Sequence, residues 1–276
     1  MISIENYAFA GCKSLKEITL PLSLTTIGNY VFSGCTSLIN VSLPLTLTSI
    51  GNYSFAGCSS LNNISIPPSI NVISEGAFYV CTSLIRISIP SSVTLIQDYA
   101  FAKCASLVDI FIPLSIESIG RYAFKQCSLL TNISIPSTIT SINEGTFYGC
   151  SSLKQIQIPD SVKIIKKYAL CKCSSLINVH LPSTMTSINE GTFSGCSLLT
   201  HIIIPESVIS IQKNAFAKCL SLTDMLIPSS VTSIGKFAFS GCTSIQNISI
   251  PSNITSIDKG TFCECASLKK SQFQNQ

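Results

Sequence analysis

Charged residues and histidines are scarce in this chain of 276 residues. Only 11% of the residues are charged and the formal net charge is +4, so no field is strong enough to indicate a nucleic-acid partner. Two histidines leave little material for metal binding or acid–base catalysis. No apolar run reaches the roughly 18 residues of a membrane span, because Ser, Thr, Asn and Pro interrupt every apolar segment. No signal peptide is recognisable either.

What the chain does contain is one pattern of constant length, repeated without an insertion or a deletion. The repeat is 23 residues long, as the step from Pro21 to Pro44 shows. Eleven prolines from Pro21 to Pro251 keep this step, and so do twelve cysteines from Cys12 to Cys265. A fixed period of about 20–50 residues is typical of a solenoid, whose coils bury their apolar faces only against one another. The uniform repeat therefore predicts a single elongated domain over residues 1–276, with about 11–12 coils.

The residues before each proline alternate as in a half-buried strand. Val41 and Leu43 are apolar, and Ser42 between them is polar. The crossovers are too long for hairpins, so we expect parallel, in-register strands joined by right-handed crossovers and ended by the prolines. The pattern predicts one strand per coil, centred on Val41, Ile64, Ile87, Ile110, Ile133, Ile156, Val179, Ile202, Met225 and Ile248.

The remaining apolar positions of a coil predict the core. The side chains expected to point inward in one coil are Leu38, Val41, Leu43, Leu47, Ile50, Phe55 and Cys58. The return limb from Thr48 to Cys58 is expected to be irregular or to form short 3₁₀ turns, since so short a repeat leaves little room for a helix. Glycine follows Glu75, Glu144 and Glu190, at the position where other coils carry tyrosine. This difference predicts a second turn type, in which glycine relieves a constraint on the backbone conformation.

The pattern Leu-x-x-Ile-x-Ile-Pro-x-x-Val-x-x-Ile-x-x-x-Ala-Phe-x-x-Cys, found from Leu84 to Cys104, resembles the BspA-like (Treponema-type) leucine-rich repeat family. The resemblance covers essentially the whole chain. It implies a mostly β, α/β-type solenoid: a right-handed leucine-rich-repeat stack with a parallel concave β-sheet. It also implies an adhesion or interaction module on a cell surface or outside the cell. A cytoplasmic location remains the alternative, because reduced cysteines are compatible with both.

The cysteine column predicts buried thiols rather than disulfides. Neighbouring members lie about 4.8 Å apart with parallel side chains, whereas a disulfide needs its Cβ atoms nearer 3.8 Å. The thiols from Cys35 to Cys242 are expected to act as small buried hydrophobes, so that serine at Cys104 would lack an assured partner. Cys171 and Cys263 lie outside the column and are predicted to be the most reactive thiols. Their spacing from the other cysteines does not match that of a zinc site.

The candidate binding residues are those that depart from the repeat on the outward face of the strands. Serine is the default in one outward column, and large residues replace it in several coils; apolar strips of this kind mark interaction sites. Drift in a redundant repeat is the competing explanation. The candidate ligand-binding residues are Phe111, His180, His201, Ile203, Asp224, Leu226, Arg86 and Asp109. Arg86 and Asp109 are expected to form a cross-strand ion pair, and His201 and Asp224 a hydrogen bond.

Two further groups of polar residues have ordinary explanations. Lys154, Lys163, Lys166, Lys167 and Lys172 form a basic cluster, interpreted as a solvated return limb, with an anionic partner as the alternative. Sequons at Asn40, Asn52, Asn63, Asn132, Asn247 and Asn253 are interpreted mainly as an asparagine row, with glycan attachment left open.

The function predicted is a non-enzymatic module that binds a protein or an extracellular-matrix ligand on the concave sheet. No cofactor and no metal are expected, since no nucleophile or third ligand accompanies His201 and Asp224. Met1 occupies the slot of Leu24 and Leu47, and residues 271–276 are polar, so the chain is expected to be incomplete at one or both ends. The alternative function is a structural protein that self-associates end to end through uncapped coils.

Overall fold

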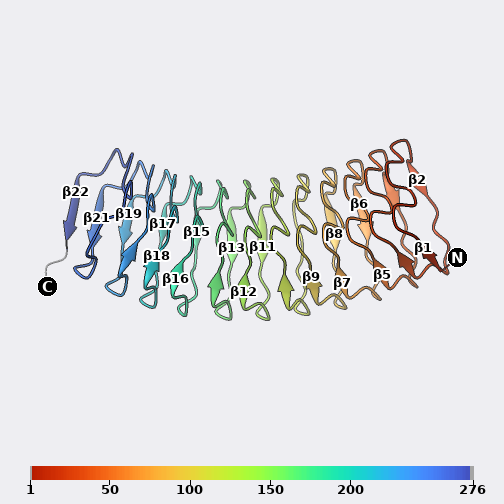
Figure 1. The fold of residues 1–276 in the computed structure, drawn as a ribbon, viewed down its shortest axis with the longest axis horizontal. Coiled ribbons are helices and arrows are strands. Elements are labelled where there is room, and N and C mark those ends of the chain that lie inside the picture. Colours follow the sequence, from red (N-terminus) through yellow and green to blue (C-terminus); the bar gives the residue numbers. More distant parts are fainter. Residues whose placement is uncertain (1, 274–276) are drawn as a thin grey trace. The chain divides into compact units, whose positions relative to one another are not determined.

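The computed structural model describes residues 2–273, and the chain divides into two compact units, Met1–Thr138 and Ile139–Gln276. In each unit the chain forms successive coils that lie side by side (Figure 1). Strand partners in neighbouring coils are separated by one repeat, as in the pairing of Ser3 with Thr26. The slot predicted for Met1 lies outside the described residues, as do residues 274–276. That the whole chain forms a single domain stays a prediction.

Two rows of short parallel strands run through the first unit. The first row precedes the prolines and contains β2 (Glu17–Ile18), β4 (Asn40–Val41), β6 (Asn63–Ser65), β8 (Arg86–Ser88) and β11 (Asn132–Ser134). The second row follows the prolines and contains β1 (Ser3–Ile4), β3 (Thr26–Ile27), β5 (Ser49–Ile50), β7 (Val72–Ile73), β9 (Leu95–Ile96) and β10 (Ser118–Ile119). The registers, such as Ile64 with Ile87, keep each residue beside its own copy.

The second unit has the same two rows. The row before the prolines contains β13 (Gln155–Gln157), β15 (Asn178–Val179), β17 (His201–Ile202), β19 (Asp224–Leu226), β21 (Asn247–Ile250) and β22 (Lys270–Phe273). The row after the prolines contains β12 (Ser141–Ile142), β14 (Ile164–Ile165), β16 (Ser187–Ile188), β18 (Ser210–Ile211) and β20 (Ser233–Ile234). Pairing is again parallel and in register, as in β16–β18–β20. The predicted fold class, a solenoid of parallel strands, is confirmed.

The prediction of one strand per coil is wrong in two respects. A second strand lies within the limb that was expected to be irregular, for example β5 between Thr48 and Cys58. Two residues are too few to show the alternation by which a strand is recognised in a sequence. Ile110 lies outside any strand, because in its coil the first row is reduced to isolated bridges of Asp109 with Arg86 and with Asn132. No helix forms within residues 2–273, as expected for so short a repeat.

The predicted core is confirmed. All seven inward positions are buried, with exposed fractions of 0–9% for Leu38, Val41, Leu43, Leu47, Ile50, Phe55 and Cys58. The phenylalanine rings stack from coil to coil, with centroids 5.2 Å apart for Phe32 and Phe55 and 5.4 Å apart for Phe216 and Phe239. Full burial of such a side chain stabilises the fold by about 1.5–3 kcal/mol relative to exposure. Leu170 takes the place of phenylalanine in one coil and is also buried, so the core is continuous within each unit.

The cysteine ladder is buried and free of disulfides from Cys35 to Cys242, as predicted. Its thiols also donate hydrogen bonds to the preceding coil. The Sγ atom of Cys104 lies 3.1 Å from the carbonyl oxygen of Phe78, and equivalent contacts recur along the ladder. The expectation that serine at position 104 would lack a partner is therefore wrong, because the same carbonyl is available to a hydroxyl. The ladder joins coils by hydrogen bonds in addition to filling the core.

Cys171 corrects the expected pattern of thiol reactivity. Its side chain is buried, with an exposed fraction of 5%, whereas Cys12 and Cys263 are exposed. Burial raises the pKa of the Cys171 thiol, which lowers the fraction present as reactive thiolate. Burial likewise raises the pKa of Cys104 to about 12 and that of Cys265 to about 11, from an ordinary value of 9.0. The exposed thiols are therefore the reactive ones.

The glycine and tyrosine coils share one turn type, so the prediction of a second type is wrong. Gly76 and Gly191 have φ angles of 56° and 58°, and Tyr30 and Tyr53 have 58° and 53°. All four residues occupy the left-handed region, which glycine adopts at little cost. The glycine serves a different purpose: a Cβ atom on Gly76 would lie 2.2 Å from the Tyr53 ring. Glycine thus makes room for the tyrosine of the preceding coil.

The residue before that glycine completes the contact with the tyrosine. The Tyr53 hydroxyl donates a hydrogen bond of 2.9 Å to Oε1 of Glu75, and the Tyr168 hydroxyl one of 2.8 Å to Oε1 of Glu190. The bond to Glu190, together with burial, raises the pKa of Tyr168 to about 12. Where Phe237 replaces tyrosine, the ring again lies over a glycine but the preceding residue is Lys259. In these coils, therefore, the glutamate is present where the preceding coil has a tyrosine hydroxyl to donate to it, and absent where that coil has phenylalanine.

Val80 occupies a second left-handed position that recurs in each coil just before the cysteine. Its φ angle is 61°, while Gly34, Gly57 and Gly149 have φ angles of 75°, 73° and 74° at the same position. A β-branched residue in this region is strained, because its Cβ atom crowds the following carbonyl. Val80 is therefore a local source of strain in the first unit.

Thiol labelling tests the burial of the ladder. In the folded protein we expect a thiol reagent to modify Cys12 and Cys263 quickly and Cys265 more slowly, because these are the thiols in contact with solvent. All 14 cysteines should react after denaturation. Mass spectrometry of labelled peptides identifies the modified residues. Fast labelling of Cys104 or Cys171 under native conditions would contradict the burial described here.

Alkaline unfolding tests the hydrogen-bonded ladder. A thiol pKa that is higher in the folded than in the unfolded chain stabilises the fold fully below about pH 9, and this stabilisation is lost as the pH rises towards the folded value. The Cys104 thiol, whose pKa is raised to about 12, should lower the free energy of unfolding by about 1.4 kcal/mol per pH unit in that window. The free energy of unfolding of Cys104→Ala, measured by urea denaturation, should therefore fall less steeply with pH than that of the parent chain. Equal slopes for the parent chain and Cys104→Ala would contradict the assignment.

The strain at Val80 gives a reciprocal pair of substitutions. Val80→Gly should raise the free energy of unfolding by about 1 kcal/mol, because release of left-handed strain exceeds the entropic cost of glycine. Gly57→Val should lower it by about 1–2 kcal/mol, although a Cβ atom there meets neighbours only at 3.6 Å. Urea denaturation of both variants measures the two changes. Destabilisation by Val80→Gly would show that packing of the valine outweighs its backbone strain.

Candidate functional site

The outward face of the first strand row carries the residues that the sequence singled out. The strands alternate between exposed and buried side chains, as in β6 and β8. The predicted outward direction is therefore confirmed for these columns. Asparagine and serine are the common residues of the two exposed columns, for example Asn63 and Ser65. Departures from them change the surface without changing the core.

In the first unit the departures are Arg86, Asp109 and Phe111. Phe111 is 75% exposed, and Ile85 and Val108, which precede Arg86 and Asp109, are exposed as well. Arg86 and Asp109 lie opposite each other in adjacent coils, as the register predicted. The ion pair expected between them does not form in the described structure, where no guanidinium nitrogen of Arg86 lies within 4.0 Å of an Asp109 carboxylate oxygen. Both side chains therefore point to solvent without neutralising each other.

In the second unit the departures lie on or directly after β15, β17 and β19. His180 and His201 are exposed, as are Ile203 and Leu226, with exposed fractions of 72% and 70% for the last two. Asn178 pairs with His201, which places the two histidines on adjacent coils. The hydrogen bond expected between His201 and Asp224 is not formed among the described residues. Asp224 nonetheless occupies the His201 position one coil further on.

A pocket of about 390 Å³ lies among these residues. The residues that line it are Asn178, Val179, His180, Leu181, Ser183, His201, Ile202, Ile203 and Pro205. Three of the predicted residues, His180, His201 and Ile203, are therefore brought together in one concavity. Leu226 and Asp224 belong to the next coil and are not part of its lining, and Phe111, Arg86 and Asp109 belong to the first unit.

The chemistry of this site is that of binding. Within residues 2–273, no three His, Cys, Asp or Glu side chains come together as a metal-binding group. The imidazoles of His180 and His201 accompany an otherwise mostly apolar lining. Clefts with apolar walls and a few polar groups are typical of recognition sites. The pocket can therefore accept an apolar group and offer it a small number of hydrogen bonds.

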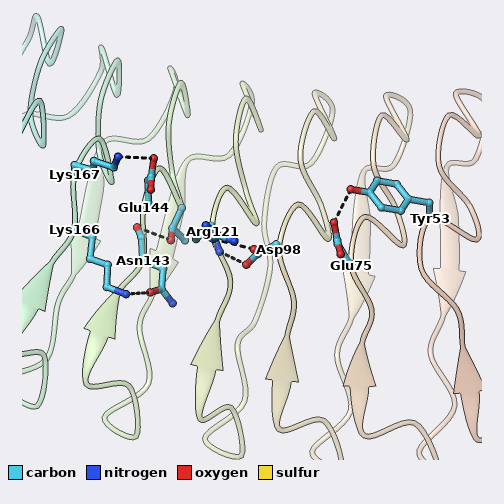
Figure 2. Close-up of polar contacts among 9 residues, drawn as sticks. Tyr53, Glu75, Asp98, Arg121, Asn143, Glu144, Lys166 and Lys167 are labelled. Carbon is cyan, nitrogen blue, oxygen red and sulfur yellow. Dashed lines mark hydrogen bonds and ion pairs between the residues drawn. The ribbon is translucent and has the colours of Figure 1, made fainter.

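A second set of polar contacts, shown in Figure 2, was missed by the sequence interpretation. It lies at the corner after the second strand row, where Asp98 and Arg121 form an ion pair of 3.0 Å in the first unit. In the second unit Glu144 contacts Lys167 at 3.4 Å, and Glu190 contacts Lys213 at 3.8 Å. The sequence does contain a signal for these pairs, because in each pair an acidic residue is followed by a basic residue one repeat later. Exposed pairs of this kind contribute about 0–1 kcal/mol, so they support the coil rather than bind a partner.

The basic cluster belongs partly to this corner. Lys166 donates a hydrogen bond of 2.8 Å from Nζ to Oδ1 of Asn143, beside the contact of Lys167 with Glu144 (Figure 2). Lys172 lies over the ring of Tyr148, with 5.6 Å from Nζ to the ring centroid. Three of the five lysines therefore make contacts within the chain. This arrangement agrees with the interpretation of the cluster as part of an ordinary return limb.

Parallel strands stacked once per repeat, with inward leucine and isoleucine columns, define a leucine-rich-repeat solenoid. The chain belongs to the BspA-type leucine-rich repeat family, because the family model described as "BspA type Leucine rich repeat region (6 copies)" matches residues 1–107, 94–219 and 188–276. The resemblance seen in the sequence is thereby confirmed. Proteins of this type are general protein-interaction scaffolds and are typically surface-associated.

Three solved structures illustrate the likeness. A leucine-rich repeat protein of Bacteroides ovatus is 31% identical with a TM-score of 0.78, and the match covers 98% of this chain and 82% of that one. A leucine rich cell surface protein of Faecalibacterium prausnitzii is 26% identical with a TM-score of 0.64, covering 100% and 83%. A leucine-rich repeat protein of Eubacterium ventriosum shares the fold at 23% identity, with a TM-score of 0.68 and coverage of 100% and 82%.

Comparison with curated protein sequences gives no match. No helix that could cross a membrane is present in the part of the chain that the structure describes.

Proposed function

We propose that the chain is a non-enzymatic interaction or adhesion module that binds a protein or extracellular-matrix ligand on the exposed face of its first strand row. The observation that carries this proposal is the exposure of Ile203 and Leu226 beside the pocket of His180 and His201. Exposed apolar groups next to a concavity are a common mark of interaction surfaces. Their outward positions contribute nothing to the core, so stability does not account for their size.

The rigid strand face favours binding. Val179 and Ile202, which lie between the outward residues, are buried with exposed fractions of 8% and 3%. Each outward side chain is therefore held by a strand whose other side is packed in the core. Contacts made from such a frame cost little ordering entropy, which is one source of affinity in preorganised surfaces.

The family supports a location on the cell surface or outside the cell. The F. prausnitzii protein, 26% identical over the whole chain, is described as a cell surface protein. By analogy, the ligand of this chain is a protein or a matrix component met outside the cell. Phe111, with Arg86 and Asp109, is a second contact region of the first unit in this proposal.

Replacement of the exposed apolar residues tests the proposal. His180→Ser, Ile203→Ser and Leu226→Ser return each site to the serine that is common in this column, so each should leave the free energy of unfolding within about 0.5 kcal/mol of the parent. Binding to a panel of purified extracellular-matrix and secreted proteins, followed by biolayer interferometry, measures the function. For any partner that binds the parent chain, Ile203→Ser or Leu226→Ser should cost about 2 kcal/mol or more.

Matched controls remove equally exposed apolar side chains elsewhere. Leu22→Ser and Leu45→Ser delete residues that are 83% and 76% exposed in the first unit. These variants should bind as the parent does. A partner that tolerates the replacements of His180, Ile203 and Leu226 but not the controls would place the binding surface away from this face and overturn the assignment.

A further inference from the structure

The pocket of the second unit arises where the pairing of two strands ends. β15 and β17 are paired at Asn178 with His201 and at Val179 with Ile202. Beyond these residues the two chains are no longer paired as strands, and His180, Leu181 and Ser183 face Ile203 and Pro205 across the pocket. The opening is thus fixed by the backbone of two adjacent coils.

The lining is mostly apolar and contains no permanently charged group. Its polar groups are the two imidazoles, the Asn178 amide and the Ser183 hydroxyl. An occupant therefore needs an apolar portion that fills the pocket, and any charge that it carries must reach beyond the lining. A long side chain with an aliphatic stem and a charged head meets both conditions.

Three carboxylates surround the pocket. Glu206 follows Pro205, Asp160 occupies the position of Ser183 one coil earlier, and Asp224 occupies the position of His201 one coil later. All three are exposed, and none makes an ion pair within residues 2–273. Two other acidic residues of the second unit, Glu144 and Glu190, are neutralised by lysines at the corner. Unneutralised negative charge is therefore present around the pocket in a unit that carries more lysine than acid overall.

The other groups facing the histidines are few. β13 presents Gln155 and Gln157, which are uncharged, and Lys154 precedes that strand. Val179 and Ile202, beneath the histidines, are apolar. These surroundings hold three negative charges and one positive charge.

We infer that the pocket binds a basic peptide segment of the partner, with the stem of an arginine or lysine beside Ile203 and its charged head at Asp224, while Asp160 and Glu206 add negative charge around the pocket. This inference rests on the proposed function, because it names the chemistry of the ligand at the same surface. The head group pairs with a carboxylate that has no ion-pair partner in the free chain, so binding does not break an existing ion pair.

A pair of matched peptides tests the charge of the occupant. One synthetic peptide carries a central Leu-Arg sequence, and the other replaces arginine with citrulline, which keeps the shape but removes the charge. NMR titration of the folded chain, followed through the ring signals of its two histidines, gives both dissociation constants. At about pH 7.5 the arginine peptide should bind about fivefold to tenfold more tightly, as expected for a charge that meets carboxylates at short range in water.

Variants assign that difference to named groups. Asp224→Asn, whose new residue matches Asn178 and Asn247 at the same position, should reduce arginine binding about twofold to fivefold and leave citrulline binding unchanged. The control Glu264→Gln removes an exposed carboxylate elsewhere, at a position where Gln126 is accommodated, and should change neither.

The outcomes separate this inference from the proposed function. Equal binding of the arginine and citrulline peptides, or no shift of the histidine signals with either, would overturn the assignment of a basic occupant. The replacements of Ile203 and Leu226 would still decide whether the surface binds a partner. Tighter binding of the citrulline peptide than of the arginine peptide would also overturn it.

Discussion

The whole structure depends on the register between one coil and the next. Backbone donors and acceptors pair with the same position of the neighbouring coil, as Ile64 does with Ile87 and Ser210 with Ser233. A single inserted residue would turn every following side chain of a strand to the opposite face. This explains why the repeat tolerates changes of residue but shows no change of length. Phenylalanine stacks, thiol hydrogen bonds and strand pairs all follow from that one constraint.

Register also couples residues that are far apart in the sequence. The Tyr168 ring needs both the missing side chain of Gly191 and the carboxylate of Glu190, which belong to the following coil. The Cys104 thiol needs the carbonyl of Phe78 in the preceding coil. Each coil is therefore selected for its fit to its neighbours, and a residue cannot be judged from its own coil alone. This dependence on neighbouring coils is the general property of solenoid proteins.

The same architecture leaves the outward columns free to vary. Ser65 and Leu226 occupy equivalent positions on strands with buried central residues, Ile64 and Met225, although one side chain is small and polar and the other large and apolar. A surface can thus change without a cost to the core. The departures at His180, His201 and Ile203 lie on adjacent coils, where they form one pocket. A scaffold of this kind gains a binding site by local substitution on a constant frame.

Much of this could be predicted from the sequence because the period is long, constant and repeated many times. Parallel strands, the inward positions of Val41 and Phe55, the buried thiols and the outward direction of Phe111 and Ile203 all follow from spacing and alternation. The second strand row could not be predicted in the same way. β5 has only two residues, and alternation needs more than two positions to be visible.

Distances between side chains were decided by the tertiary structure. Sequence spacing placed Arg86 beside Asp109 and His201 beside Asp224, yet neither pair forms a direct contact, since exposed side chains gain little from such pairs in water. Asp98 and Arg121 do meet, because a backbone hydrogen bond from Arg121 to the Asp98 carboxylate holds them together. The pocket beside Ile203 depends on where the pairing of β15 and β17 stops. The sequence by itself determined the repeat, its register and its inner and outer faces. Contacts across the coils were decided by the folded backbone, because rotamers and the ends of strand pairing depend on neighbours that only the folded chain supplies.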